Sequence, residues 1–395
     1  MARNRWLILA LLFLARTAMG LQFQSVGSVA PFLVESIGIQ YAAAGTLIGL
    51  YLLPGVFISL PGGMLGERFG AKRIVVAGLA MMAAGGLVMG VSQSFAALAC
   101  GRLLSGTGAV LMNVLLTKMV ADWFAGREIA TAMAILVTSW PFGIALGLLG
   151  FVPLAAWLGW PAVMTVAALV CVPCLFGVAA FYRPAPGSAD AVPARFELNL
   201  TAREWLLVSF AGFVWATYNV GYIVLVSFMP GYFTSRGYAL VEASALVSWL
   251  GWALMLFVPV GGYLADRLGR PDAVMLGGFV LTGIATVCLA TGALPMMLAF
   301  GVIAFAVGPP AGPIMALPAS ALRLHNRATG MGIYFTWYYA LMATFPALAG
   351  LARDITQSST TPLLFAALMM AFAVAGVMGF RLVARMPAAA ATISR

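Results

Sequence analysis

Long apolar runs alternate with short polar breaks along the whole chain of 395 residues. Each run holds about 20 residues, enough for an α-helix to cross a hydrocarbon core of ~30 Å. The pattern predicts an all-α membrane protein with twelve transmembrane helices. The predicted spans are approximately Trp6–Pro31, Ala42–Leu65, Ile74–Val91, Phe95–Val120, Ile129–Leu149, Pro161–Phe181, Trp205–Pro230, Val241–Ala265, Ala273–Ala290, Leu294–Leu317, Ala328–Leu351 and Pro362–Leu382.

One polar break is much longer than the others and separates two groups of six spans. It runs from Arg183 to Glu204, and Pro184 and Pro193 within it disfavour regular structure. We therefore expect three parts. These are an amino-terminal six-helix bundle over residues 1–182, a cytoplasmic linker over 183–204 and a carboxy-terminal six-helix bundle over 205–395.

The two groups of spans repeat each other at a nearly fixed offset. Residues of the same type recur 199 positions apart, as Arg68 and Arg267 show (267 − 68 = 199). Further pairs at this offset are Trp6 and Trp205, Pro31 and Pro230, Gly38 and Gly237, Gly63 and Gly262, and Gly70 and Gly269. Parallel repeats of this kind build many secondary transporters, whose substrate site lies near the membrane midplane between the halves.

Composition and charge support a membrane location. With 63% hydrophobic and only 8% charged residues, the chain cannot hide its apolar side chains in a soluble core. If both termini are cytoplasmic, the outer loops hold only two basic residues, Arg236 and Arg353. This bias predicts an integral protein of the plasma membrane, the inner membrane in a bacterium, with both termini cytoplasmic. The net charge of +10 then reflects topology and predicts no nucleic-acid partner.

The sequence offers little for catalysis or metal binding. All four cysteines fall within predicted spans, namely Cys100, Cys171, Cys174 and Cys288. Cys171 and Cys174 are close in sequence but lack the second pair of polar ligands that a zinc site needs. No nucleophile–base pair or cofactor motif is recognisable. We therefore expect neither an enzyme nor a protein with a metal or cofactor.

Two loop motifs, one in each repeat, join a carboxylate to arginines and glycines. They comprise Gly63, Glu67, Arg68, Gly70 and Arg73 in the first copy and Gly262, Asp266, Arg267, Gly269 and Arg270 in the second. Both resemble the cytoplasmic loop signature of the major facilitator superfamily, although the first copy has Glu67 where the family usually has aspartate. The resemblance implies the major facilitator fold of two pseudo-symmetric six-helix bundles and a gating role for the motifs. Alternatively, their basic residues only set the topology.

Two arginines, Arg16 and Arg102, lie inside apolar runs that contain no aspartate or glutamate. A guanidinium keeps its charge, and placing it near the centre of a membrane helix costs ~2.5–3.5 kcal/mol on insertion scales. We therefore expect both to face an anionic substrate. Arg102 also resembles the superfamily's second recurrent motif, an arginine followed by glycines on the fourth span. Alternatively, each arginine bonds backbone carbonyls, at a broken helix for Arg16 or near a helix end for Arg102.

Polar and aromatic side chains at helical spacing complete the predicted substrate site. Amides, phenols and indoles can hydrogen-bond the oxygens of an anion while ring faces cover its apolar part. Packing or a belt at the membrane interface is the alternative for each aromatic residue. The candidates beside the two arginines are Gln22, Gln24, Asn113, Trp215, Tyr218, Asn219, Tyr222, Tyr334, Trp337 and Tyr338.

These patterns predict a monomeric transporter that moves a small anion across the lipid bilayer by alternating access. The anion would be an organic carboxylate or a small inorganic ion, and transport would be facilitative or coupled as a symporter or antiporter. An exporter of hydrophobic drugs or toxic compounds is the alternative function. Prolines at 141 and at 309–310 predict bends in the fifth and tenth spans.

Overall fold

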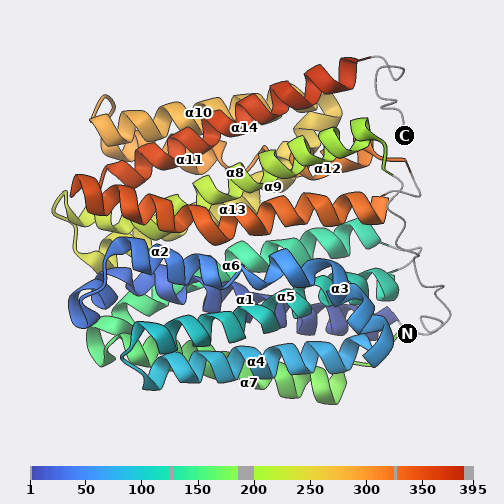
Figure 1. Ribbon diagram of the computed structural model, residues 1–395, viewed down its shortest axis with the longest axis horizontal. Coiled ribbons are helices and arrows are strands. Elements are labelled where there is room, and N and C mark those ends of the chain that lie inside the picture. Colours follow the sequence, from blue (N-terminus) through green and yellow to red (C-terminus); the bar gives the residue numbers. More distant parts are fainter. Residues whose placement is uncertain (1, 125–127, 186–199, 324–326, 387–395) are drawn as a thin grey trace.

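The computed structural model describes residues 2–124, 128–185, 200–323 and 327–386. Within its helices, the side chains at positions 2–4, 60–64, 67, 130, 319 and 327–329 lie outside the description. The described part is built from α-helices that run side by side along one direction (Figure 1). They are α1 (Ala2–Ile37), α2 (Tyr41–Leu50), α3 (Pro54–Phe69), α4 (Ala71–Val91), α5 (Phe95–Phe124), α6 (Ile129–Leu158), α7 (Trp160–Phe181), α8 (Ala202–Thr234), α9 (Leu240–Leu268), α10 (Pro271–Thr291), α11 (Met296–Ala306), α12 (Ala311–Ala321), α13 (Arg327–Thr356) and α14 (Thr361–Arg385).

The predicted spans correspond to these helices, with two spans each made of two helices. In the described part, eleven helical segments are long and apolar enough to cross a membrane, and α13 occupies the place of the remaining predicted span. The second span consists of α2 and α3, and the tenth of α11 and α12. Most helices extend several residues beyond the predicted bounds, because helices continue past the hydrocarbon core into the interface.

The bend in the tenth span lies at its prolines. Helix α11 ends at Ala306 and α12 begins at Ala311, so Pro309 and Pro310 fall in the break as the sequence predicts. Proline lacks a backbone donor and its ring clashes with the preceding turn. Helix α6, by contrast, runs through Pro141 without ending. The second span also breaks, over residues 51–53 before Pro54, which the apolar pattern alone does not predict.

The repeat seen in the sequence recurs in the backbone. Gly38 and its equivalent Gly237 have φ angles of 71° and 96°, and Gly70 and Gly269 have φ angles of 87° and 60°. Glycine adopts such angles without the steric cost that a Cβ brings. The corresponding connections of the two halves therefore both turn at a glycine with positive φ, although the ψ angles of Gly70 and Gly269 differ, at 129° and 22°.

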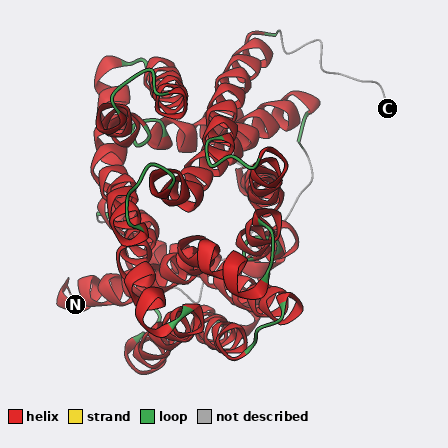
Figure 2. Cartoon of the chain, turned by 90° about the vertical axis from the view of Figure 1, so that its left-hand side faces the viewer, coloured by secondary structure: helices red, strands yellow, loops and turns green. Residues whose placement is uncertain are grey.

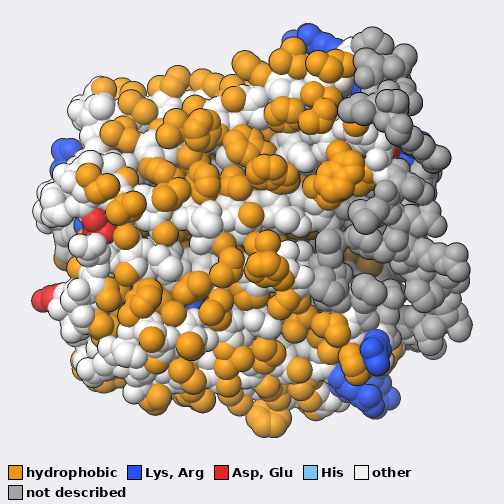
Figure 3. Space-filling model, in the orientation of Figure 1, with side chains coloured by type: hydrophobic (Ala, Val, Ile, Leu, Met, Phe, Trp, Pro, Cys, Tyr) orange, Lys and Arg blue, Asp and Glu red, His pale blue; other side chains and the backbone are white. Residues whose placement is uncertain are grey.

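Each group of six spans packs mainly on itself. Helix α1 lies against α6 and α7, and α4 lies against α5 and α7; in the second half α8 lies against α14, and α10 against α14. Seen end-on in Figure 2, the helices form two groups. Contacts between the groups run chiefly through α13 with α2 and α3 and through α6 with α9, and α1 also meets α8. Apolar side chains are spread over the face shown in Figure 3, and the charged side chains visible there lie mainly towards its two ends, as contact with lipid requires.

The helices run between two ends of the molecule. The termini end carries both chain ends and the turns at Gly70 and Gly269; the loop end is the opposite one and carries the turns at Gly38 and Gly237 (Figure 1). The predicted linker is described only at its edges, because residues 186–199 lie outside the described part. The division of the chain at 183–204 therefore stays a prediction.

Candidate functional site

Arg16 lies near the middle of α1 and is held by two neighbouring helices. Its Nε donates a hydrogen bond to Oδ1 of Asn113 on α5 at 3.0 Å, and its Nη1 donates to the carbonyl of Leu136 on α6 at 2.8 Å. Tyr338 and Tyr339 of α13, in the other half, are close enough to interact with its charge. Within the described residues, its Nη2 donates no hydrogen bond. Arg16 thus has one nitrogen left for a further partner.

The surroundings of Arg16 indicate where that nitrogen can find a partner. Arg16 as a whole residue is half-buried, and so is Asn113 beside it. Yet α1 is covered by α5, α6 and α7 of its own half, and on another side it meets α8 of the second half. We infer that the exposed part of Arg16 faces the space between the halves rather than lipid. A positive charge there is available to an anion that enters between them.

Arg102 is placed differently from what the sequence predicts. It is fully buried, and each of its three nitrogens donates to a backbone carbonyl at 2.9 Å, namely those of Leu47, Gln22 and Phe23. Its guanidinium also lies 4.6 Å from the ring centre of Tyr51. All four partners belong to the first half. The alternative interpretation holds in that Arg102 satisfies backbone carbonyls, but those of Gln22 and Phe23 lie inside α1 and not at a helix end. Arg102 therefore forms no part of the proposed substrate site.

A glycine and the break in the second span make this arrangement possible. A Cβ at Gly106 on α5 would overlap the carbonyl of Tyr51, which lies at the break between α2 and α3. Glycine therefore lets α5 approach the bent segment closely. The Arg102 side chain then joins its own helix α5 to carbonyls of α1 and α2, which supports the bundle from within.

The two predicted glutamines occupy different places. Gln22 is fully buried; its Nε2 donates to the carbonyl of Met82 on α4 at 2.8 Å, and its Oε1 accepts from Tyr51 at 3.4 Å. It therefore belongs with Arg102 inside the first half. Gln24 donates to Ser28 at 3.4 Å, whereas its Oε1 is buried and has no partner in the described part. Gln24 lies beside Gly27, which also approaches Ser227 of α8, at the contact between the halves.

Four aromatic rings of the second half come together, as the sequence predicts. The ring centre of Trp215 on α8 lies 5.8 Å from that of Tyr218, 6.3 Å from Tyr334 and 6.2 Å from Tyr338. We call these four residues the aromatic wall. The indole nitrogen of Trp215 is buried and has no hydrogen-bond partner in the described part of the chain. Because Tyr338 also interacts with Arg16, the wall and the cation are neighbours across the halves.

The polar groups around the wall are partly satisfied by backbone. The Tyr218 hydroxyl donates to the carbonyl of Val307 at 2.8 Å, and the Asn219 amide donates to that of Trp215 at 2.8 Å. The hydroxyl of Tyr334 contacts the sulfur of Met315 at 3.4 Å. The buried Tyr222 hydroxyl has no partner in the described part. Tyr222 and Trp215 thus retain hydrogen-bonding capacity.

Trp337 points away from this group. It is 37% exposed and makes an edge contact with Phe213 at 6.0 Å, on the outer side of α13. The same helix supplies a residue that the prediction omitted. Tyr339 is buried and interacts with both Asn113 and Arg16. Helical spacing predicts which residues of α13 share one face of the helix. It does not predict which face points into the bundle, because that depends on how the other helices pack against α13.

The loop motifs lie at the termini end, and the description covers them in part. The side chain of Glu67 and the surroundings of Gly63 lie outside it. Arg68 lies over the ring of Phe69, and Arg267 donates to the Tyr263 hydroxyl at 3.1 Å, so both contact their own helices. The remaining motif side chains in the described part are exposed, namely Arg73, Asp266 and Arg270. Their gating role stays a proposal.

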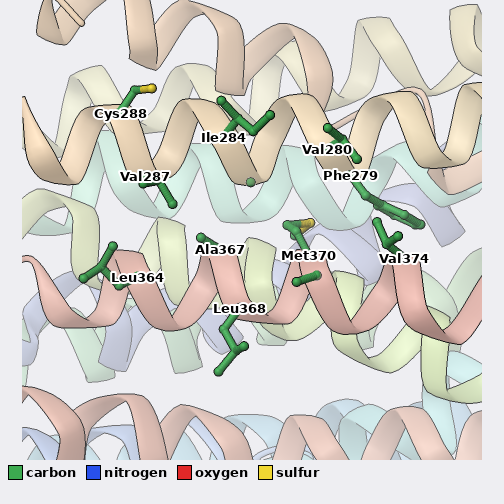
Figure 4. A pocket seen from close by; sticks show the side chains of 12 residues that line it. Phe279, Val280, Ile284, Val287, Cys288, Leu364, Ala367, Leu368, Met370 and Val374 are labelled. Carbon is green, nitrogen blue, oxygen red and sulfur yellow. The ribbon is translucent and has the colours of Figure 1, made fainter. Parts of the chain in front are cut away.

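A separate apolar groove lies at the side of the second half. It has a volume of about 560 Å³ and runs between α10 and α14, as Figure 4 shows. Its lining includes Val280, Ile284 and Leu364, whose side chains are 44%, 58% and 41% exposed on the apolar surface. No predicted site residue lines it. The groove suits contact with lipid and takes no part in the site.

Within the described residues, no group of three histidine, cysteine, aspartate or glutamate side chains could hold a metal ion. The chemistry available between the halves is that of a fixed cation with an amide, phenols and an indole around it. Such a set binds oxygens of an anion and packs against an apolar group. It has no arrangement suited to nucleophilic attack or general base catalysis.

Comparison with known proteins identifies the family. The sequence pattern of the Major Facilitator Superfamily matches residues 12–346, and the chain belongs to this family. It is an integral membrane transporter and not an enzyme.

Two relatives align over most of their length. The chain is 25% identical over 373 residues to the 4-hydroxybenzoate transporter PcaK of Pseudomonas aeruginosa, which covers 83% of this chain and 81% of that protein. It is 28% identical over 399 residues to the 3-(3-hydroxy-phenyl)propionate transporter of Escherichia coli, covering 96% and 94%.

A solved structure has the same fold. The bacterial homologue of the human lysosomal transporter Spinster, in an inward-facing and occupied conformation, aligns with a TM-score of 0.77 at 16% identity. The alignment covers 97% of each chain. This likeness confirms the fold of two pseudo-symmetric six-helix bundles that the sequence predicts.

Proposed function

We propose that this protein carries a small organic anion across the membrane and that Arg16 binds the charge of the anion. The observation that carries this proposal is the half-satisfied guanidinium. Asn113 and the Leu136 carbonyl fix the Nε and Nη1 atoms, whereas Nη2 is unpaired within the described residues, and Tyr338 and Tyr339 of the second half lie near the guanidinium. A carboxylate there would form a charge-assisted hydrogen bond, which is shorter and stronger than a neutral one.

The aromatic wall supports an aromatic acid as the substrate. With a carboxylate on Arg16, a ring in the same molecule would pack against Tyr338 and Trp215, which line the neighbouring surface. Aromatic pairs contribute about 0.5–1.5 kcal/mol beyond the burial of their area. The two relatives described above are named for phenolic carboxylates. These substrates have the carboxylate and the ring that the site would accommodate.

Transport would proceed by alternating access between the two halves. We propose that residues 1–182 and 205–395 form the moving halves and that 183–204 links them. Because the pathway lies between the halves of one chain, a monomer suffices as the transport unit. The termini end would face the cytoplasm, as the distribution of basic residues favours.

The test is counterflow in proteoliposomes. Labelled 4-hydroxybenzoate, acetate and nitrate are offered to vesicles that contain the wild-type protein, the Arg16→Gln variant or the Arg236→Gln variant. Arg236 is an exposed arginine at the loop end, so its replacement removes the same charge away from the site. We expect saturable uptake of the aromatic acid by wild type and by Arg236→Gln, and at least a tenfold loss in Arg16→Gln.

The loss should appear while the protein remains folded. A monodisperse profile and an unchanged melting temperature in detergent would show that Arg16→Gln acts on binding alone. Equal uptake by wild type and Arg16→Gln would contradict the assignment of Arg16. A wild type that moves none of the three anions would contradict the anion class.

A further inference from the structure

Helices α2 and α13, which belong to opposite halves, approach each other unusually closely. A Cβ at Gly45 would overlap the carbonyl of Pro346, and a Cβ at Gly49 would overlap that of Ala343. Closer to the loop end, a Cβ at Gly350 would overlap the carbonyl of Tyr41. The two helix backbones are thus in direct contact over several turns. Glycines four residues apart are a common means of such contact between membrane helices.

At the loop end, this contact finishes in a polar interaction. The carboxylate of Asp354 on α13 accepts hydrogen bonds from the first two backbone N–H groups of α2, those of Tyr41 at 3.0 Å and Ala42 at 2.7 Å. The residue before the helix, Gln40, makes no side-chain cap of its own. The cap of α2 therefore comes from the other half of the protein. A carboxylate at a helix amino terminus also interacts favourably with the helix dipole.

The neighbouring residue adds a second contact to the same helix end. The guanidinium of Arg353 lies 3.6 Å from the ring centre of Tyr41. The same guanidinium packs beside Gly231 of α8, within its own half. Arg353 was singled out in the sequence as one of two basic residues in the outer loops. Its position over Tyr41 adds a contact between the halves, which a residue that only sets the membrane topology would not need.

The termini end has different contacts. The ion pairs of the described residues there join Arg5 to Glu128 within the first half, at 2.7 Å, and Arg323 to Glu204 and Arg381 to Asp272 within the second. None of these three pairs crosses between the halves. The hydrogen bonds of Asp354, by contrast, connect the halves directly at the loop end. Among the described residues, the polar contacts between the halves are therefore unequal at the two ends.

We propose that Asp354, Arg353 and the glycine contact of α2 with α13 form a latch that holds the loop end closed. The inference rests on the proposed alternating access, since a latch matters only if the halves separate there. Opening the loop end removes the Asp354 carboxylate from the amino terminus of α2 and leaves two backbone N–H groups without this partner. Release of the latch would therefore set the balance between the two states of the transporter.

The test measures the distance between spin labels at the loop end. Gln93 lies between α4 and α5 in the first half, and Ala293 lies between α10 and α11 in the second; both are exposed. Cysteines at these positions, in a full-length chain whose four native cysteines are alanine, carry the labels in lipid nanodiscs. We expect one short distance for this parent protein. Asp354→Ala should raise the ratio of long to short distances by about fivefold, as the loss of a helix cap predicts.

Two further variants and one control make the result decisive. Asp354→Asn retains one acceptor oxygen and Arg353→Gln removes only the contact with the ring, so both should shift the distribution less than alanine at 354. Glu35→Gln removes an exposed carboxylate at the same end that makes no contact with the other half in the described part of the chain. This control should leave the distance distribution unchanged. If all variants at Asp354 and Arg353 give the same distance distribution as the parent protein, the latch proposal is wrong. Because no substrate is needed, a failure of anion transport leaves this test intact.

Discussion

Arg16 and Arg102 are both charged side chains within apolar helices of the first half, yet their surroundings differ. All three nitrogens of Arg102 donate to carbonyls of that half, and its side chain is fully buried. Arg16 uses two nitrogens, stays half-buried and interacts with tyrosines of the second half. A buried cation in a membrane helix therefore does not by itself indicate a ligand. What distinguishes the two is the number of donors that the protein leaves unsatisfied.

Replacing Arg102 should have the largest effect, and the effect should be on stability. Arg102→Gln removes the charged donor from the carbonyls of Leu47, Gln22 and Phe23, and a hydrogen bond to a charged group contributes about 1.5–3 kcal/mol. We expect a melting temperature in detergent several degrees below that of wild type and a low yield of monodisperse protein. If Arg102→Gln is as stable as wild type but fails to bind anions, Arg102 belongs to the substrate site after all.

Asn113→Asp should give the next largest effect, this time on transport. Asn113 Oδ1 already accepts from Arg16 Nε at 3.0 Å, so a carboxylate there would neutralise the guanidinium from within the protein. We expect counterflow of 4-hydroxybenzoate to fall at least tenfold with little change in melting temperature. Asn113→Ala, which removes the contact without adding charge, should lose less. Transport by Asn113→Asp at the wild-type rate would show that Arg16 does not act as the anion's counter-charge.

Replacing the central ring of the aromatic wall should have a smaller, substrate-dependent effect. Trp215→Leu removes ring contacts to three tyrosines, which corresponds to about 0.5–1.5 kcal/mol per aromatic pair. We expect the half-saturating concentration of an aromatic acid to rise about three- to tenfold, while that of acetate, if it is carried, stays the same.

Trp337→Leu is the matched control for the wall. It removes the same side chain from the outer side of α13, where Trp337 is 37% exposed, and should change uptake less than twofold. Equal losses in the two tryptophan variants would show that the wall does not contact the substrate.

The sequence predicted the fold well because the fold follows from local patterns. Apolar runs of membrane length and the repeat at 199 positions are visible in one chain, and equivalent glycines such as Gly70 and Gly269 turn with positive φ in both halves. Apolar pattern alone did not predict the break before Pro54. That break follows from proline chemistry and from close packing of Gly106 against Tyr51.

The site was predictable only in part. Trp215, Tyr218, Tyr334 and Tyr338 come together because helical spacing places them on facing sides of two helices. The surroundings of Arg102 could not be predicted, because its partners are backbone carbonyls, which every residue carries and no side-chain pattern marks. The latch at Asp354 was equally invisible, since its partner is a backbone amide of a helix more than 300 positions away.

The most direct test of the account is the equilibrium binding of 4-hydroxybenzoate, measured by calorimetry on purified wild type and Arg16→Gln of equal melting temperature. If Arg16 holds the charge of the substrate, removing it should weaken binding by about 30-fold or more, as the loss of a buried charged partner costs at least ~2 kcal/mol. Equal dissociation constants for the two proteins would contradict the central claim.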